Sequence, residues 1–169
     1  MFLRRWNWLA DGLLAVVLAG FLLAMPTAGT QKKPNLDKIP KQVMDALKAK
    51  FPKAEIDKWS KEKEDGMVIY DFEFKQEGQK FEADIKEDGT IHNWEREISV
   101  KDLPEIVRKA VEAKYPQSVI KEIMAITEVT DGKEELEGYE IILETARKKE
   151  IEVTVAPDGK FLEGPGVKK

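Results

Sequence analysis

One pattern of residues occurs twice in this chain, first in residues 39–98 and again in residues 103–163. Each copy opens on an aliphatic residue followed by proline, continues to an aromatic residue followed by proline, and ends near an Asp-Gly pair. The matching positions are Ile39-Pro40 and Leu103-Pro104, Phe51-Pro52 and Tyr115-Pro116, and Asp88-Gly89 and Asp158-Gly159. Their separation grows from 64 to 70 residues, which places extra residues of the second copy around 130–137. A small unit used twice predicts two neighbouring supersecondary structures that bury each other's apolar faces.

The first 29 residues have the layout of a secretory signal peptide. Arg4 and Arg5 precede an unbroken apolar run over residues 13–24, and small residues follow it. The run has 12 residues, whereas a membrane-spanning helix needs about 20, so we expect cleavage before Thr30 and export to the periplasm or beyond. An uncleaved anchor is the alternative, and it would be the one contact with a membrane. The polar residues 30–38 are expected to form a linker.

The composition excludes some kinds of partner and some kinds of stabilising bond. The chain has no cysteine, so it has no disulfide framework and no thiolate metal site. Its 28 Lys and Arg residues are interleaved with 32 Asp and Glu residues, for a net charge of −4. Nucleic-acid binding needs a basic face, so we expect no nucleic-acid partner.

Each copy begins with a helical pattern. Apolar residues recur at helical spacing over residues 39–51 and 103–115, and the proline after each stretch ends the helix. Asp37 is a candidate N-cap of the first helix. After each helix the apolar period changes to two, which is typical of half-buried antiparallel strands.

The predicted fold class is therefore α+β, with two tandem repeats at residues 39–99 and 102–163. Each repeat is expected to be one helix followed by a four-stranded antiparallel β-meander, with the helix lying on one face of its sheet. Residues 164–169 are rich in glycine and lysine, and we expect them to form a flexible tail.

These elements resemble the PepSY-like domain family, which is similar in fold to the bacterial β-lactamase-inhibitor protein. The resemblance covers about residues 38–163 and rests on the aromatic-proline pairs, the Asp-Gly pairs and the matching Tyr70 and Tyr139. It implies a secreted or periplasmic, non-enzymatic module with a role in protein binding or inhibition. The cysteine pairs of the β-lactamase-inhibitor protein are absent from this sequence, and nothing in the chain points to β-lactamase as a target.

No residue pattern predicts a catalytic residue, a cofactor or a metal site. The chain has one histidine, His92, and no serine lies in a nucleophile-elbow motif. The Asp-Gly loops lack the ligand spacing of a calcium loop and are explained as turns. Four acids alternate with apolar residues, so we expect them on a solvated strand face with cross-strand lysine partners. These acids are Asp71, Glu73, Glu82 and Asp84.

His92 and Trp94 are the candidate partner contacts. Gly164 stands in the second copy where the first has Trp94, so the repeat itself does not require this ring. Tryptophans are favoured as interface anchors, and packing between the two copies is the alternative role. We predict an exported, non-catalytic module that binds a protein or peptide. The alternatives are an anchored structural or assembly protein of the envelope, a small-ligand or cation binder, or an enzyme with Glu82, Asp84 and His92 in one deep pocket.

Overall fold

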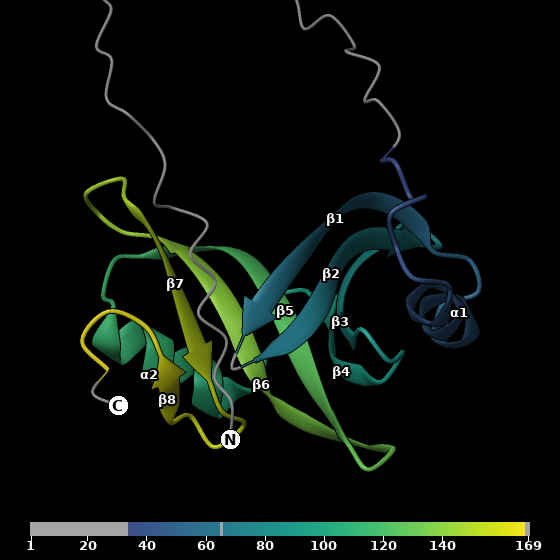
Figure 1. The fold of residues 1–169 in the computed structure, drawn as a ribbon. Helices are drawn as coiled ribbons and strands as arrows, with labels where there is room; N and C mark the ends of the chain where they lie inside the picture. The colour runs from purple at the N-terminus through teal and green to yellow at the C-terminus, as the bar shows by residue number, and fades with distance from the viewer. Residues whose placement is uncertain (1–33, 65, 168–169) are drawn as a thin grey trace, which may run out of the picture. The chain divides into compact units, whose positions relative to one another are not determined.

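Eight strands form one antiparallel sheet in the computed structural model, which describes residues 34–64 and 66–167 (Figure 1). The strands lie side by side in sequence order, so each pairs with its neighbours along the chain. They are β1 (Glu55–Glu64), β2 (Met67–Gln76), β3 (Gln79–Lys86), β4 (Ile91–Glu97), β5 (Val119–Thr130), β6 (Lys133–Glu144), β7 (Glu150–Val155) and β8 (Phe161–Glu163). Helix α1 (Lys41–Lys50) precedes β1, and helix α2 (Glu105–Lys114) precedes β5. The chain therefore has the predicted α+β class.

The predicted signal peptide and the first residues of the predicted linker lie outside the described residues. Within residues 34–64 and 66–167, no helix is both long and apolar enough to cross a membrane. Residues 164–167 of the predicted tail are described, and they contact the second copy. The hydroxyl of Tyr115 donates a hydrogen bond to the Pro165 carbonyl oxygen at 3.1 Å.

Both helices begin directly after a proline. Pro40 and Pro104 occupy the N-cap positions with extended backbone, and neither helix has a side-chain hydrogen bond at its cap. The prediction that Asp37 caps the first helix is therefore wrong. A proline disfavours the helical conformation of the residue before it, so α1 cannot extend back through Ile39 to Asp37. At the other end, Phe51 and Tyr115 leave the helical conformation just before the next proline.

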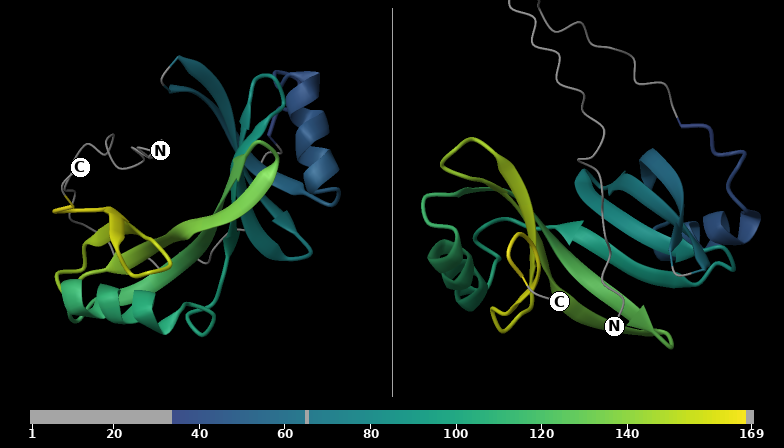
Figure 2. Two further views of the ribbon diagram at one scale, coloured as in Figure 1. Left: turned by 90° about the horizontal axis from the view of Figure 1, so that it is seen from below. Right: turned by 60° about the vertical axis from the view of Figure 1, so that its left-hand side comes forward.

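Each helix covers one half of the same sheet face with an apolar core (Figure 2). Val43 and Leu47 are the fully buried contacts of α1, and Val107 and Val111 play this part in α2. The core under α1 consists of Ile39, Val43, Leu47, Phe51, Tyr70, Phe72, Phe74, Phe81, Ala83 and Ile85. The core under α2 consists of Leu103, Val107, Val111, Ile123, Tyr139, Ile141, Leu143, Val153 and Val155. Helices on one face leave the opposite face of the sheet available for polar side chains.

Irregularities of the sheet recur at matching places in the two halves. One extra residue interrupts the β1–β2 register at Asp57, and Lys121 interrupts the β5–β6 register in the same way. A second pair of bulges lies at His92 in β4 and Leu162 in β8. The β5–β6 hairpin is the part that differs, because its strands have 12 residues each against 10 in β1 and β2. A further bulge at Glu137 completes the insertion.

Candidate binding face

Acidic side chains line the sheet face that the helices leave uncovered. Residues directly opposite each other on antiparallel strands share a face. The strand register places five such residues side by side on β2, β3, β4, β5 and β6. We call them the acidic row: Asp71, Asp84, Asn93, Glu128 and Glu135. No lysine or arginine occupies a position in this row.

A second line of acids runs beside the acidic row, two residues away along each strand. Glu73, Glu82 and Glu95 lie opposite one another on β2, β3 and β4. Lysines reach this line from both sides. Lys58 of β1 contacts Glu73 at 3.2 Å, and Lys80 of β3 contacts Glu82 at 3.1 Å. The predicted lysine–acid pairing therefore occurs in this second line.

The prediction that these acids are solvated is wrong for three of the four residues. Asp71 and Glu82 are buried, and the exposed fraction of Asp84 is 2%. Glu95, which the sequence analysis did not single out, is equally buried at 2%. The strands β3 and β4 lie in the interior of the sheet, so side chains of neighbouring strands flank these acids on both sides. Burying a carboxylate is costly unless charges or hydrogen-bond donors compensate for lost water.

Lys80 compensates part of this negative charge. Its ammonium group lies 2.5 Å from Glu122 of β5 and 3.1 Å from Glu82. Partial burial acts to lower the pKa of Lys80, but the hydrogen bond to Glu122 and the charge of Glu82 outweigh burial, and the pKa is raised above its usual value. The lysine is therefore fully charged at neutral pH and links β3 to β5.

Asn93 lies at the centre of the acidic row, and one of its polar atoms has no partner. Its amide Nδ2 donates a hydrogen bond to Asp84 Oδ2 at 3.1 Å. Its carbonyl Oδ1 is buried and accepts no hydrogen bond from any described residue. On β5, Glu128 is the residue opposite Asn93 in the row. Two acceptors thus stand next to each other where a donor is missing.

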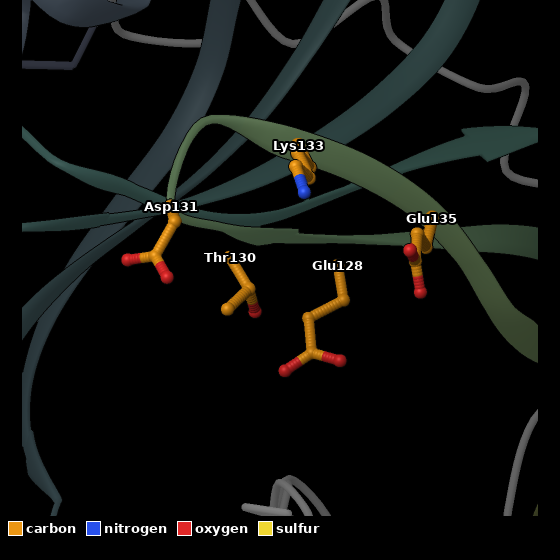
Figure 3. A pocket seen from close by; sticks show the side chains of 5 residues that line it. All are labelled: Glu128, Thr130, Asp131, Lys133 and Glu135. Atoms are coloured by element: carbon orange, nitrogen blue, oxygen red, sulfur yellow. The ribbon is translucent and has the colours of Figure 1, made fainter.

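The row ends at an open pocket of about 290 Å³ on the β5–β6 hairpin (Figure 3). Its lining consists of Glu128, Thr130, Asp131, Lys133 and Glu135. The side chains of Glu128 and Thr130 extend to the same side of the hairpin. Glu128 and Glu135 face each other across the two strands, and among the described residues neither has an ion-pair partner. The pocket therefore carries three carboxylates against one ammonium group.

The pKa of Glu137 shows how crowded the carboxylates are beside this pocket. Glu137 is the bulged residue of β6, two positions beyond Glu135. Partial burial raises its pKa, and the negative charges of Glu128 and Glu163 raise it further. Burial and the two neighbouring carboxylates therefore both disfavour ionisation of Glu137.

The family model that matches this sequence covers residues 27–93 and 68–163 and is described as "Putative beta-lactamase-inhibitor-like, PepSY-like". The chain belongs to this PepSY-like family. No curated protein matches the sequence.

Three solved structures that are similar in fold to this chain come from Bacteroides species. A "BLIP-like protein" from Bacteroides fragilis has 19% sequence identity and a TM-score of 0.53, over 75% of this chain and 85% of that chain. A "DUF2874 family protein" from Bacteroides uniformis has 14% identity and a TM-score of 0.56, over 75% and 88% of the two chains. A structure from Bacteroides eggerthii named "putative periplasmic proteins" has 16% identity and a TM-score of 0.57, over 75% and 87%. At these identities the likeness is one of fold.

Trp94 of the PepSY-like chain lies on the helix side of β4, away from the acidic row. Its ring centroid is 6.0 Å from that of Phe51 and 6.5 Å from that of Phe81. The Lys50 ammonium lies 5.0 Å from the ring centroid. Along the sheet, Thr127 and then Leu136 continue the line of positions from Trp94. Leu136 is 47% exposed, so this line leads from the packed core to an apolar side chain at the surface.

His92, the other candidate contact, is the bulged residue between Ile91 and Asn93. It is partly buried, and it does not line the pocket at the β5–β6 hairpin. Its role and that of Trp94 in partner binding stay predictions.

The acids of this face are spread over neighbouring strands of the sheet. Within residues 34–64 and 66–167, no group of three or more histidine, aspartate or glutamate side chains is arranged to hold a metal ion. Glu82 and Asp84 lie in two adjacent lines of acids on an extended sheet face, rather than with His92 in the pocket described above. What this arrangement can do chemically is accept hydrogen bonds and attract positive charge.

Proposed function

We propose that this chain is an exported, non-catalytic module that binds a protein or peptide partner on the sheet face opposite its helices. In this proposal the scaffold consists of two copies of one helix followed by four strands. The periplasmic name of a structural neighbour supports export. The beta-lactamase-inhibitor-like description supports a protein as the kind of partner.

The observation that carries the proposal is the pairing of Glu128 with Glu135. Like charges directly opposite each other on neighbouring strands destabilise a sheet. Among the described residues neither carboxylate forms an ion pair, although Lys133 lines the same pocket and Glu134, the residue next to Glu135, pairs with Lys50. A destabilising arrangement on an otherwise well-packed sheet is typical of a functional surface, where stability is given up for binding.

A capture experiment with matched variants tests the proposal. The purified full chain, the double variant Glu128→Gln/Glu135→Gln and the variant Trp94→Ala are each immobilised and incubated with envelope extract, and the bound proteins are identified by mass spectrometry. The double variant Glu105→Gln/Glu112→Gln is the control, since it removes two charges from the exposed side of α2.

The proposal expects a protein that wild type and the α2 control enrich and that Glu128→Gln/Glu135→Gln loses. Loss with Trp94→Ala alone would move the contact to the helix side of β4 and contradict the proposed face. Capture of no specific protein at several salt concentrations would contradict protein binding and favour a structural or small-ligand role.

A further inference from the structure

We infer that the acidic row recognises an extended segment rich in lysine or arginine, and that the pocket at Glu128 and Glu135 receives one of its cationic side chains. This inference rests on the proposed function and adds the chemical class of the partner. Three independent features of the described residues lead to it: charge, hydrogen-bonding capacity and length.

The charge of the row matches a cationic partner. The acidic row holds four carboxylates and one amide. Five described lysines share this face with the acids: Lys58 contacts Glu73, Lys75 contacts Asp57, Lys80 contacts Glu82 and Glu122, Lys86 lies two residues from Asp84 along β3, and Lys133 lines the pocket. Burial raises the pKa of Glu137, and the negative charges of Glu128 and Glu163 raise it further. A surface of this kind steers and orients a positively charged partner.

The hydrogen-bonding capacity of the row also matches lysine or arginine. Ionised carboxylates only accept hydrogen bonds, and lysine and arginine side chains only donate them. The buried Asn93 Oδ1 is a further acceptor with no donor among the described residues. A buried acceptor left without a partner is costly, and a donor from a bound segment removes this cost. The unpartnered amide oxygen therefore points to the same class of ligand as the charges do.

A metal ion fits the face less well than an organic cation does. A hard divalent cation needs six to eight oxygen ligands around one point. The acids of this face are instead spread over neighbouring strands, about 4.8 Å apart from one strand to the next. The described residues contain no group of three acids arranged to hold an ion. Hydrogen-bond acceptors that are spread along the face suit a ligand whose donors are spread in the same way.

The length of the row sets the length of the segment. From Asp71 on β2 to Glu135 on β6 the row crosses four gaps between strands, or about 19 Å at the usual strand spacing. An extended chain covers this distance with about six residues. Alternate side chains of an extended segment share one side, so about three lysines or arginines would face the row.

Binding of a defined peptide tests the inference. The probe is a fluorescein-labelled peptide of about eight residues in which lysine alternates with threonine, and its control has glutamate in place of lysine. Fluorescence anisotropy gives Kd for the full-length wild type and for the double variants Glu128→Gln/Glu135→Gln and Glu105→Gln/Glu112→Gln. Titration with calcium ions alone, followed by thermal unfolding, tests for a metal ligand.

We expect the lysine peptide to bind wild type, and the glutamate peptide not to bind. Loss of two charge-assisted contacts should weaken binding by about tenfold or more in Glu128→Gln/Glu135→Gln. The α2 control should change Kd by less than about twofold, because exposed charges more than a Debye length away are screened. If Glu128→Gln/Glu135→Gln does not fold, Glu135→Lys provides a second variant, and it should weaken binding further because it repels the probe.

Three results would overturn the inference. One is failure of the lysine peptide to bind; another is equal weakening by both double variants, which would indicate attraction by net charge alone. The third is a calcium-dependent rise in melting temperature that Glu128→Gln/Glu135→Gln abolishes. Competition separates this inference from the proposed function. A captured protein that requires Glu128 and Glu135 but is not displaced by the lysine peptide would leave the proposed function standing and refute a basic segment as the ligand.

Discussion

Glu128 of β5 lies directly opposite Glu135 of β6, near the turn of their hairpin and on the face away from both helices. The adjacent residue Glu134 instead forms an ion pair with Lys50 of α1. In β6, Glu134 is therefore paired with a cation on one side of the strand, whereas Glu135 faces a like charge on the other side. The hairpin is held by contacts on the helix side, and the opposed carboxylates are available for a ligand.

The variant Glu135→Lys should be more stable than wild type and bind a cationic partner less well. It replaces a like-charge cross-strand pair by an opposite-charge pair, a change worth about 0.2–1 kcal/mol in the free energy of unfolding. Urea unfolding at neutral pH measures this gain. The control Glu105→Lys places the same charge on α2, where it removes the ion pair with Lys109 and should lower stability slightly. A loss of stability in Glu135→Lys would show that Glu128 and Glu135 do not repel each other.

The variant Glu137→Gln should stabilise the protein at pH 7 and leave it unchanged in acid. Burial and the charges of Glu128 and Glu163 raise the pKa of Glu137 in the folded state. For a carboxyl group with a raised pKa, the cost to folding is fully present above the folded pKa. This cost decreases as the pH falls towards the ordinary value of 4.5. Melting temperatures of wild type and variant should therefore differ at pH 7 and converge below about pH 4.5.

The variant Glu144→Gln should change the melting temperature in the opposite direction, so it serves as a control for this measurement. The hydrogen bond from Lys148 lowers the pKa of Glu144, so its contribution to stability is present above 4.5 and is lost as the pH falls through its folded pKa. Glu144→Gln should lower the melting temperature at pH 7 and have no effect in strong acid. If both variants change the melting temperature in the same direction at pH 7, the raised pKa of Glu137 would be contradicted.

The variant Gly89→Ala should destabilise the protein more than Gly78→Ala does. Both glycines have positive φ, 88° and 83°, so alanine is strained at either position. A Cβ atom at Gly89 would also lie 2.9 Å from the carbonyl oxygen of Gln42 in α1, whereas nothing lies within 4 Å at Gly78. We expect a loss of about 1 kcal/mol at Gly78 and about 1–3 kcal/mol more at Gly89. Equal losses in chemical denaturation would show that the turn does not pack against α1.

The local elements of this fold can be predicted from the sequence because they depend on neighbouring residues. The helices follow from the apolar spacing and end near the prolines, and the turns at Glu77-Gly78 and Asp88-Gly89 lie between paired strands as expected. Helix α1 begins later than a cap at Asp37 predicts: Asp37 is a good capping residue, but Pro40 disfavours the helical conformation of the residue before it.

The candidate site could be predicted only in part, because it depends on pairing between strands. Alternation placed Asp71 and Asp84 on one face of their strands, but it does not show that they lie opposite each other. Asn93, Glu128 and Glu135 join them through the β3–β4, β4–β5 and β5–β6 registers, and bulges shift two of these three. A one-residue shift of register moves a side chain to the other face. The sequence therefore indicates that the strands carry acids, and only the structure shows that these acids form a continuous row.

The variant Trp94→Ala distinguishes packing from partner contact on the helix side of β4. The ring packs near Phe51 and Phe81 and lies under the Lys50 ammonium, so its removal should cost about 2–3 kcal/mol, less than for a fully buried aromatic side chain. The buried Nε1 of Trp94 has no hydrogen-bond partner among the described residues. Trp94→Phe, which removes this donor and keeps a ring, should therefore cost much less than Trp94→Ala in urea unfolding. If Trp94→Ala leaves stability unchanged but abolishes capture of a partner, the ring is a binding contact. If it destabilises as expected and capture persists below the melting temperature, packing against the core under α1 accounts for this tryptophan.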